Sequence, residues 1–355
     1  MNTLEEALHY PWGADLPAAG GALQLAPGLA WLRMELPFAL NHINLWLLRD
    51  EMDGRQGWTV IDTCVDSPQS RAQWEQVIAG QMQGLPVLRV LATHMHPDHL
   101  GLAHWLSARF SAPLWISMSD YLTARLAVNQ QDAFGGPATA EFFVLHGMKD
   151  DRVLTLVVDR KDHYAQLVPQ IPRQYRRLQD GQTLSLGGRQ WRCISGFGHS
   201  PEHMALYCDD PGLAQPVLIS GDMVLPRIST NVSLFVTEPD GNPLQLFLDS
   251  LEKFLPLPEN TLVLPSHGRP FVGLHERIKQ LRDHHQERLE EVMHACAEQP
   301  RCAADIVPVM FKRELDPHQT TFALGESMAH LNLLWHTGAL RRAADDHGVL
   351  RFAAA

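Results

Sequence analysis

Long apolar stretches are missing from this sequence of 355 residues. No run approaches the roughly 18 apolar residues that a membrane-spanning helix requires. Residues 1–6 show neither a basic start nor an apolar segment of the kind found in secretory signals. We therefore expect a cytoplasmic protein without a membrane partner.

Cysteine and positive charge are also scarce. The five cysteines are odd in number and show no close pairing, so a disulfide framework is not expected. The formal net charge of −11 provides no field that would gather nucleic acid, and nucleic acid is not expected as a partner. Hydrophobic residues make up 45% of the chain, which suffices for one large domain and a smaller one.

Residues 93–101 read THMHPDHLG and contain four potential metal ligands: His94, His96, Asp98 and His99. Neutral imidazoles and carboxylates are the ligands that hold zinc and similar divalent ions. One ion could not easily take all four side chains. Two neighbouring ions could, with His94 and His96 on the first and Asp98 and His99 on the second. Other histidines, such as His285, lack such neighbours in the sequence and are expected to be ordinary solvated or core-edge residues.

The sequence around this motif predicts its place in the fold. Residues 86–92 form an apolar run typical of a buried strand, and a helical pattern starts at residue 101. The four ligands therefore lie in a strand-to-helix loop, where α/β folds commonly place their chemistry.

The motif resembles the T-H-x-H-x-D-H-x-G signature of hydrolytic members of the metallo-β-lactamase superfamily, such as glyoxalase II. The resemblance implies an αββα sandwich. It also implies three further ligands: His199 in a Gly-His-Ser segment, Asp222 in a strand ending in Gly-Asp, and His267 after the strand at 262–265. His199 would complete the first site and His267 the second, while the Asp222 carboxylate would bridge the two ions.

Supporting residues follow from the same resemblance. Asp62 matches an aspartate that holds the metal loop by hydrogen bonds, since such carboxylates orient the ligating histidines. His203 could be a similar supporting donor. The family usually has glycine where this chain has Cys64, whose thiol either approaches the site or packs as a small buried residue.

Two positions favour hydrolysis over other activities of the superfamily. Well-known zinc β-lactamases have cysteine at the position that Asp222 occupies in this chain. Redox diiron members have an acidic residue in place of His96. The resemblance thus implies two divalent metal ions, zinc or else iron or manganese, and a metal-bridging hydroxide oriented by Asp98 or Asp222.

The most plausible substrate is a small thioester, such as an acyl-CoA or a glutathione thioester. Phosphodiester cleavage by an endoribonuclease, lactone hydrolysis and a catalytically silent regulatory role remain as alternatives.

The chain is predicted to divide into a catalytic domain, residues 1–273, and a C-terminal domain, residues 274–355. A helical insertion over about 121–178 would interrupt the first domain, and inserted elements beside a metal loop commonly shape the substrate pocket. Candidates for that pocket are Phe142, Phe143, His146 and Tyr164, which could equally pack the insertion against the core.

The C-terminal region has a distinct pattern. Amphipathic periodicity predicts helices over 276–298, 303–311 and 325–337, and a hairpin follows over 339–342 and 349–352. This order resembles the winged-helix tail of some relatives. Residues 275–355 contain ten basic and twelve acidic residues, so a packing or homodimer-forming tail that closes one side of the active-site cleft is expected instead of nucleic-acid binding.

Overall fold

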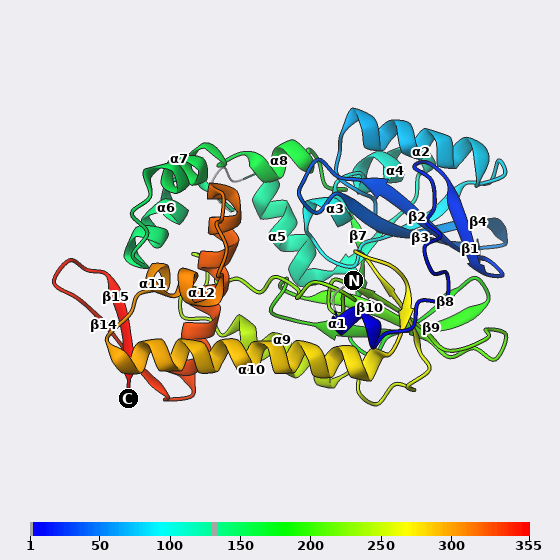
Figure 1. The fold of residues 1–355 in the computed structure, drawn as a ribbon. Coiled ribbons are helices and arrows are strands. Elements are labelled where there is room, and N and C mark those ends of the chain that lie inside the picture. The colour runs from blue at the N-terminus through cyan, green and yellow to red at the C-terminus, as the bar shows by residue number, and fades with distance from the viewer. Residues whose placement is uncertain (1–2, 130–133) are drawn as a thin grey trace.

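The computed structural model describes residues 3–129 and 134–355. Two large sheets lie face to face, helices cover their outer sides, and a helical lobe with a small hairpin extends to one side (Figure 1). The αββα architecture is confirmed. A search of the described helices finds none with the length and hydropathy of a membrane span.

The first sheet has seven strands in sequence order. The first four pair antiparallel and the last four pair parallel, with β4 shared between the two arrangements. Its strands are β1 (Ala22–Ala26), β2 (Leu29–Glu35), β3 (His42–Met52), β4 (Arg55–Ile61), β5 (Val87–Leu91), β6 (Leu114–Ser117) and β7 (Tyr175–Leu178).

The second sheet has six strands in the order β13-β12-β11-β10-β9-β8. It is antiparallel except where β11 pairs parallel with β12, so the carboxyl ends of these two strands lie at the same edge. Its strands are β8 (Thr183–Leu186), β9 (Arg189–Gly196), β10 (His203–Cys208), β11 (Val217–Gly221), β12 (Leu262–Pro265) and β13 (Phe271–Val272).

The alternation of side chains along β3 shows how the layers form. Leu45 and Leu47 belong to the core beneath the outer helices, whereas Trp46 and Leu48 belong to the core between the two sheets. Trp46 lies opposite Trp31 of β2, and the two rings stack with centroids 6.4 Å apart. Both faces of the strand are buried, which explains its nearly continuous apolar sequence.

In the described part of the chain, nine helices precede the C-terminal region. Ser67 caps α2 (Pro68–Gly80) by accepting a hydrogen bond from the amide of Ser70. The nine are α1 (Thr3–Glu6), α2 (Pro68–Gly80), α3 (Pro97–Leu100), α4 (Ala103–Phe110), α5 (Met118–Asn129), α6 (Gly136–Leu145), α7 (Asp151–Asp159), α8 (His163–Leu167) and α9 (Pro243–Glu252).

The range predicted as an insertion contains most of α5, then α6, α7, α8 and also β7. The β7 strand pairs with β6 and therefore belongs to the sandwich, which the sequence analysis did not predict. Two of its four residues, Arg176 and Arg177, are exposed. A polar strand at the edge of a sheet lacks the apolar alternation by which buried strands are recognised.

The C-terminal region consists of α10 (Leu274–Glu298), α11 (Ala303–Met310), α12 (Pro317–His336) and a hairpin of β14 (Leu340–Ala344) and β15 (Leu350–Ala354). The predicted order of three helices and a hairpin is confirmed. Its assignment as a winged helix and the domain boundary after residue 273 stay predictions.

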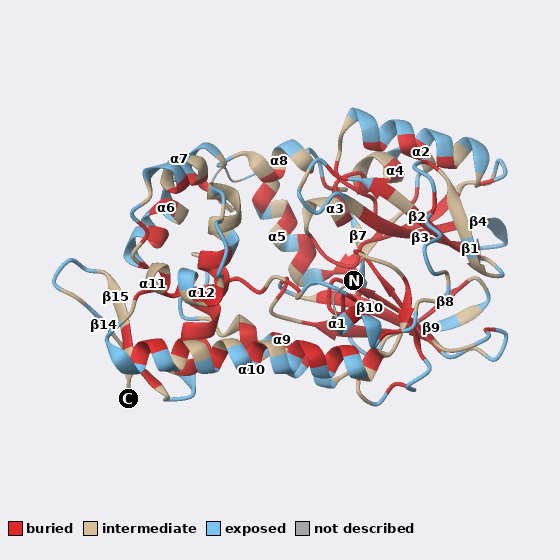
Figure 2. Ribbon diagram, viewed as in Figure 1, coloured by how far each residue is buried: buried red, intermediate tan, exposed pale blue. Residues whose placement is uncertain are grey.

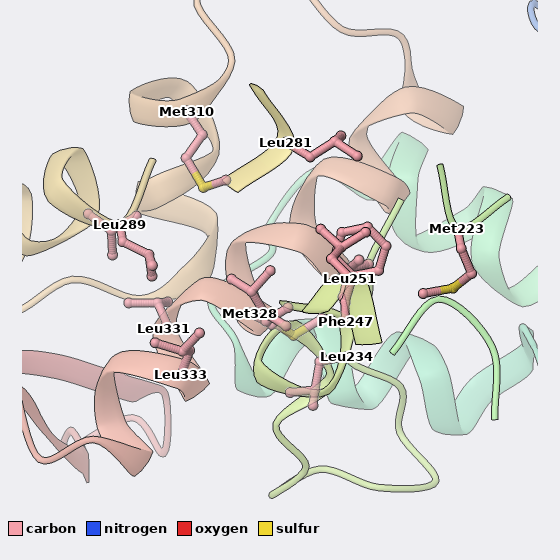
Figure 3. Packing of buried hydrophobic residues seen from close by; sticks show 14 of the residues in the cluster. Met223, Leu234, Phe247, Leu251, Leu281, Leu289, Met310, Met328, Leu331 and Leu333 are labelled. Atoms are coloured by element: carbon pink, nitrogen blue, oxygen red, sulfur yellow. The ribbon is translucent and has the colours of Figure 1, made fainter. Parts of the chain in front are cut away.

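An extensive apolar core joins this region to the sandwich. Figure 2 shows buried residues alternating with exposed ones along α10, as an amphipathic helix requires. Leu281 of α10 and Met328 of α12 belong to one buried cluster with Phe247 and Leu251 of α9 (Figure 3). The C-terminal region is thus packed onto the sandwich.

Candidate metal centre

The loop after β5 carries the four ligands predicted from the opening motif. His94 and His96 precede α3, which begins at Pro97 and includes Asp98 and His99. Gly101 follows this short helix. A β-carbon at this position would lie only 2.6 Å from the backbone oxygen of Cys64. Only glycine allows the loop to approach the neighbouring strand end so closely.

Three imidazoles form one group at the edge of the sheets. The His94 Nε2 atom lies 2.9 Å from His96 Nδ1 and 3.2 Å from His199 Nε2. His199 comes from the loop between β9 and β10, more than 100 residues further along the chain. The structure therefore brings together the three imidazoles expected to hold the first ion.

A second group contains Asp98, His99 and His267, with Asp222 between the two groups. The His267 Nε2 atom lies 3.3 Å from Asp98 Oδ2 and 3.6 Å from Asp222 Oδ1. The other oxygen of Asp222 lies 3.3 Å from His199 Nε2 in the first group. Asp222 thus contacts both groups, the position expected of a bridging carboxylate.

The spacing of these atoms fits metal ligation. Donors at about 2.0–2.2 Å from one ion in tetrahedral geometry lie about 3.3–3.6 Å from one another. His99 Nε2 and Asp222 Oδ1 are buried and make no hydrogen bond with any described residue, yet they lie 3.5 Å apart and face each other. Buried polar atoms normally have a partner, so this pair fits ligands of a cation.

The protonation of these groups also suits a metal. Burial lowers the pKa of His96 to about 3 and holds the pKa of His94 well below its ordinary value, so both rings are neutral. Burial alone would raise the pKa of Asp222, but His267 and His99 hold it well below its usual range. The first group therefore offers free imidazole nitrogens beside an ionised carboxylate. In the second group, burial opposes protonation of the rings, but Asp98 and Asp222 raise the pKa of His99, and they raise that of His267 to about 10, so a bound cation would displace a proton from each of these rings.

Asp62 lies behind the ligand loop and is fully buried. Its carboxylate accepts a hydrogen bond from the amide of Thr93 at 2.7 Å and lies 2.8 Å from His99 Nδ1. The Thr93 hydroxyl is in turn 3.1 Å from His94 Nδ1. These contacts fix the ring orientations of ligands in both groups.

His203 lies beneath the bridging carboxylate. Its Nε2 atom accepts a hydrogen bond from the amide of Asp222 at 3.1 Å, and a β-carbon at Gly221 would collide with it at 2.1 Å. A residue larger than glycine therefore does not fit before Asp222, at the end of β11. His203 supports Asp222 through the backbone.

Three supporting groups were missed in the sequence. His199 Nδ1 lies 2.8 Å from the backbone oxygen of Asn231, and His267 Nδ1 lies 2.8 Å from that of His42. Backbone carbonyls leave no signal in a sequence. The third group is Asp120 after β6, which accepts hydrogen bonds from the amides of Met95 and Glu202 and so ties the two histidine loops together.

Cys64 packs in the core beneath the outer helices and does not belong to the ligand cluster. Its Sγ atom is 3.4 Å from Ser70 Oγ, and burial raises its pKa to about 12. The backbone at Cys64 has φ of 69°, a region that favours glycine, which accounts for the glycine usual in the family. All five cysteines are free and buried, as expected.

The four residues proposed for the pocket have different positions. Phe142 and Phe143 belong to the core shared with the C-terminal helices, and the backbone oxygen of His146 accepts a hydrogen bond from Ala304 of α11. The expectation that they lie at the pocket is wrong for these three, because α6 turns its apolar side toward the C-terminal region. Tyr164 reaches the metal loop, where its hydroxyl donates to the oxygen of Met95 at 2.6 Å.

A cavity of about 390 Å³ opens directly beside the first group of imidazoles, with His96 and His199 in its wall. The described part of α10, α11 and α12 contributes no residue to this wall. The C-terminal region instead supports it from behind, because the amide of Leu234 donates to the oxygen of Gly325 in α12 at 3.1 Å. The tail thus holds a wall in place and does not itself close the cleft, contrary to expectation.

A two-sheet sandwich that brings five histidines and two aspartates together at the ends of its strands defines a metallo-hydrolase. The chain belongs to the metallo-beta-lactamase superfamily, whose family model matches residues 40–267. A second model, described as the metallo-beta-lactamase-like C-terminal domain, matches residues 289–355.

Individual relatives support this assignment. A crystal structure of a beta-lactamase domain protein from Burkholderia ambifaria is 52% identical, covers 100% of both chains and superimposes with a TM-score of 0.93. The probable metallo-hydrolase YqjP of Bacillus subtilis is 23% identical over 85% of this chain and 91% of its own length. A hydroxyacylglutathione hydrolase of Prochlorococcus marinus is 24% identical over 66% of this chain and 71% of its own length.

Proposed function

We propose that this metallo-hydrolase cleaves a small thioester with two divalent metal ions, which we assign as zinc. The observation that carries the proposal is the pairing of two ligand groups, joined by Asp222, with a cavity that opens beside them. The likeness to a hydroxyacylglutathione hydrolase supports a thioester as the bond that is cleaved.

The seven ligand residues would form two metal sites. His94, His96 and His199 would hold one ion, and Asp98, His99 and His267 the other, with Asp222 shared. The bound ions would supply a water of lowered pKa and polarise the carbonyl oxygen of the substrate.

The Asp98 carboxylate is the more accessible of the two acids, with its side chain 18% exposed against 9% for Asp222. It is placed to accept the proton of the attacking water. Addition of the water oxygen to the carbonyl carbon is followed by cleavage of the carbon–sulfur bond. The sulfur leaves as a thiolate, which needs little protonation at neutral pH, so no acid beside the leaving group is required.

The test is a substrate screen with purified, metal-loaded chain. The substrates are a thioester of N-acetylcysteamine, an acyl-CoA, a glutathione thioester, a homoserine lactone and single-stranded RNA, and elemental analysis of the same sample gives the metal and its stoichiometry. We expect release of free thiol from at least one thioester and two metal ions per chain. Cleavage of RNA or lactone alone would contradict the proposal.

A further inference from the structure

The walls of the cavity beside the metal centre are mainly apolar. Phe134, Phe197, Leu234, Phe235, Pro243 and Leu246 contribute to them. Phe134 and Phe235 meet edge to face, with ring centroids 5.6 Å apart at 88°. These side chains come from the loop before α6, the two loops that follow β9 and β11, and α9.

Two of these apolar side chains are exposed although they belong to a concave wall. Phe235 is 38% exposed and Leu246 is 45% exposed. Exposed apolar groups that line a cavity next to a reactive centre are typical of a surface that a ligand covers. Leu246 lies on the outward side of α9, whose neighbours Leu244 and Phe247 are buried in the core, so packing of the helix does not require it.

Among the described residues, those that line the cavity include no lysine or arginine. Apart from the ligand histidines, the one charged residue among these described lining residues is Glu238, which is exposed. Lys253 lies over the ring of Phe197 but donates hydrogen bonds to Asp180 and Ser195. Phosphates and carboxylates are normally bound by lysine or arginine, so the wall offers no partner for an anionic substrate group.

One arginine near the second ligand group lies outside the described cavity wall. The Arg33 guanidinium donates to the backbone oxygen of Gly268, on the side of the second ligand group, and does not line the cavity. An anionic group within the cavity would instead share the space with Glu238, and like charges repel.

The geometry points to a thioester with an uncharged, apolar acyl chain as the substrate, the chain lying against Phe235 and Leu246. This inference rests on the proposed thioester hydrolysis and specifies its substrate class. The carbonyl carbon lies at the metal centre beside His96 and His199, and the acyl chain extends along the apolar wall. Negatively charged acyl groups are disfavoured because Glu238 repels them and no lysine or arginine among the described lining residues compensates.

The first test uses neutral N-acetylcysteamine thioesters, with the metal-loaded full chain. In the series acetyl, butyryl and hexanoyl, kcat/KM should rise by about fourfold for each methylene that is buried. Pentanoyl and glutaryl thioesters have acyl chains of equal length and differ only in a terminal carboxylate. We expect kcat/KM to be at least about tenfold higher for the pentanoyl compound.

The second test changes the charge of the wall. Leu246→Lys should reduce the pentanoyl-to-glutaryl ratio by about tenfold, because it supplies the missing cation. Leu246→Met keeps an apolar side chain of similar size and should retain the ratio. Val144→Lys is a matched control, since Val144 is an exposed apolar residue of α6 outside the cavity wall, and it should leave both rates unchanged.

The outcomes separate the two proposals. A rise of kcat/KM with chain length, together with a ratio that Leu246→Lys lowers, supports the apolar substrate class. Thioester hydrolysis with no dependence on chain length, or with a preference for glutaryl, overturns this inference and leaves the proposed function standing. Absence of hydrolysis of every thioester by metal-loaded protein overturns both.

Discussion

Two histidine clusters in this molecule contain similar side chains in different arrangements. One is the metal centre at the strand ends. The other, here called the α10–α12 cluster, consists of His284, His285, His330 and Glu326. His285 Nδ1 lies 3.3 Å from His330 Nε2, and the ligand atoms of His284, His285 and Glu326 lie within 4.8 Å of one another.

The electrostatics of the two clusters differ. Asp222 keeps a pKa well below its usual range because His267 and His99 face it. Burial raises the pKa of Glu326 to about 7, and the neighbouring Arg288 offsets this only in part. At neutral pH Asp222 is a full anion, whereas Glu326 is only about half ionised, and only an ionised carboxylate attracts a cation.

The support behind the ligands differs as well. Rings of the metal centre are held from behind by Asp62 and by the backbone oxygens of Asn231 and His42. In the α10–α12 cluster, His285 Nδ1 faces the neutral ring of His330 at 3.3 Å, whereas the rings of the metal centre face a carboxylate or a backbone oxygen. A preformed metal site therefore requires ligand atoms held from outside as well as suitable residue types.

The largest expected effect comes from removing the carboxylate shared by the two ligand groups. Asp222→Ala should lower kcat/KM by roughly 1000-fold or more and reduce the metal content, because both groups lose a ligand. Elemental analysis measures the metal content, and steady-state kinetics measure kcat/KM. Asp209→Ala, an exposed acid at the end of β10, serves as the control and should be unaffected. Full activity of Asp222→Ala would contradict the two-ion assignment.

Weakening the support behind the ligands should have an intermediate effect. Asp62 has φ of 61°, which asparagine tolerates, so Asp62→Asn keeps the backbone while it removes the charge behind His99. Metal affinity or kcat/KM should fall by about 10–100-fold. Titration with a competing chelator measures the affinity. Wild-type values for both quantities would show that the ring of His99 needs no orienting carboxylate.

The buried acid of the α10–α12 cluster should affect stability instead of catalysis. The pKa of Glu326 in the folded state, about 7, exceeds the ordinary value, so the folded chain holds more protons between about pH 4.5 and 7. Its contribution to the free energy of unfolding is therefore present at low pH and is lost as the pH rises through 7. The groups that face it are Arg288, His284 and His285.

Glu326→Gln removes this titration. The variant should gain stability relative to wild type as the pH rises from 5.5 to 8, by at most about 2 kcal/mol. Thermal unfolding at both pH values measures the difference, with the exposed Glu314→Gln as control. A gain that is equal at both pH values would mean that Glu326 titrates normally.

The smallest effect is expected for His285→Leu. This change replaces a buried ring, which touches Phe247, His284 and His330, by an apolar side chain. Metal content should stay at two ions per chain, and kcat/KM should change by less than about twofold. A wild-type stoichiometry above two that falls by one in this variant would show that the α10–α12 cluster binds metal after all.

Much of the fold could be predicted from local signals. Strand β5 and helix α11 lie within one residue of the predicted limits, because an apolar run and a helix cap act within a few residues. Helix α12 begins at Pro317 and not at residue 325, since Asp316 caps it by accepting from the amide of Gln319. That Asp-Pro signal was visible in the sequence and was missed because the apolar pattern begins later.

The order of residues along the chain is enough to specify which side chains can meet at the strand ends, because the sheets carry histidines and aspartates placed directly after strands to one edge. Tertiary structure alone decided which histidines gain orienting partners, since the carbonyls of Asn231 and His42 resemble every other carbonyl of the chain. It also decided the cavity wall. Phe134, Phe235 and Leu246 come from separate loops and a helix. No periodic pattern in the sequence indicates that they line the same cavity.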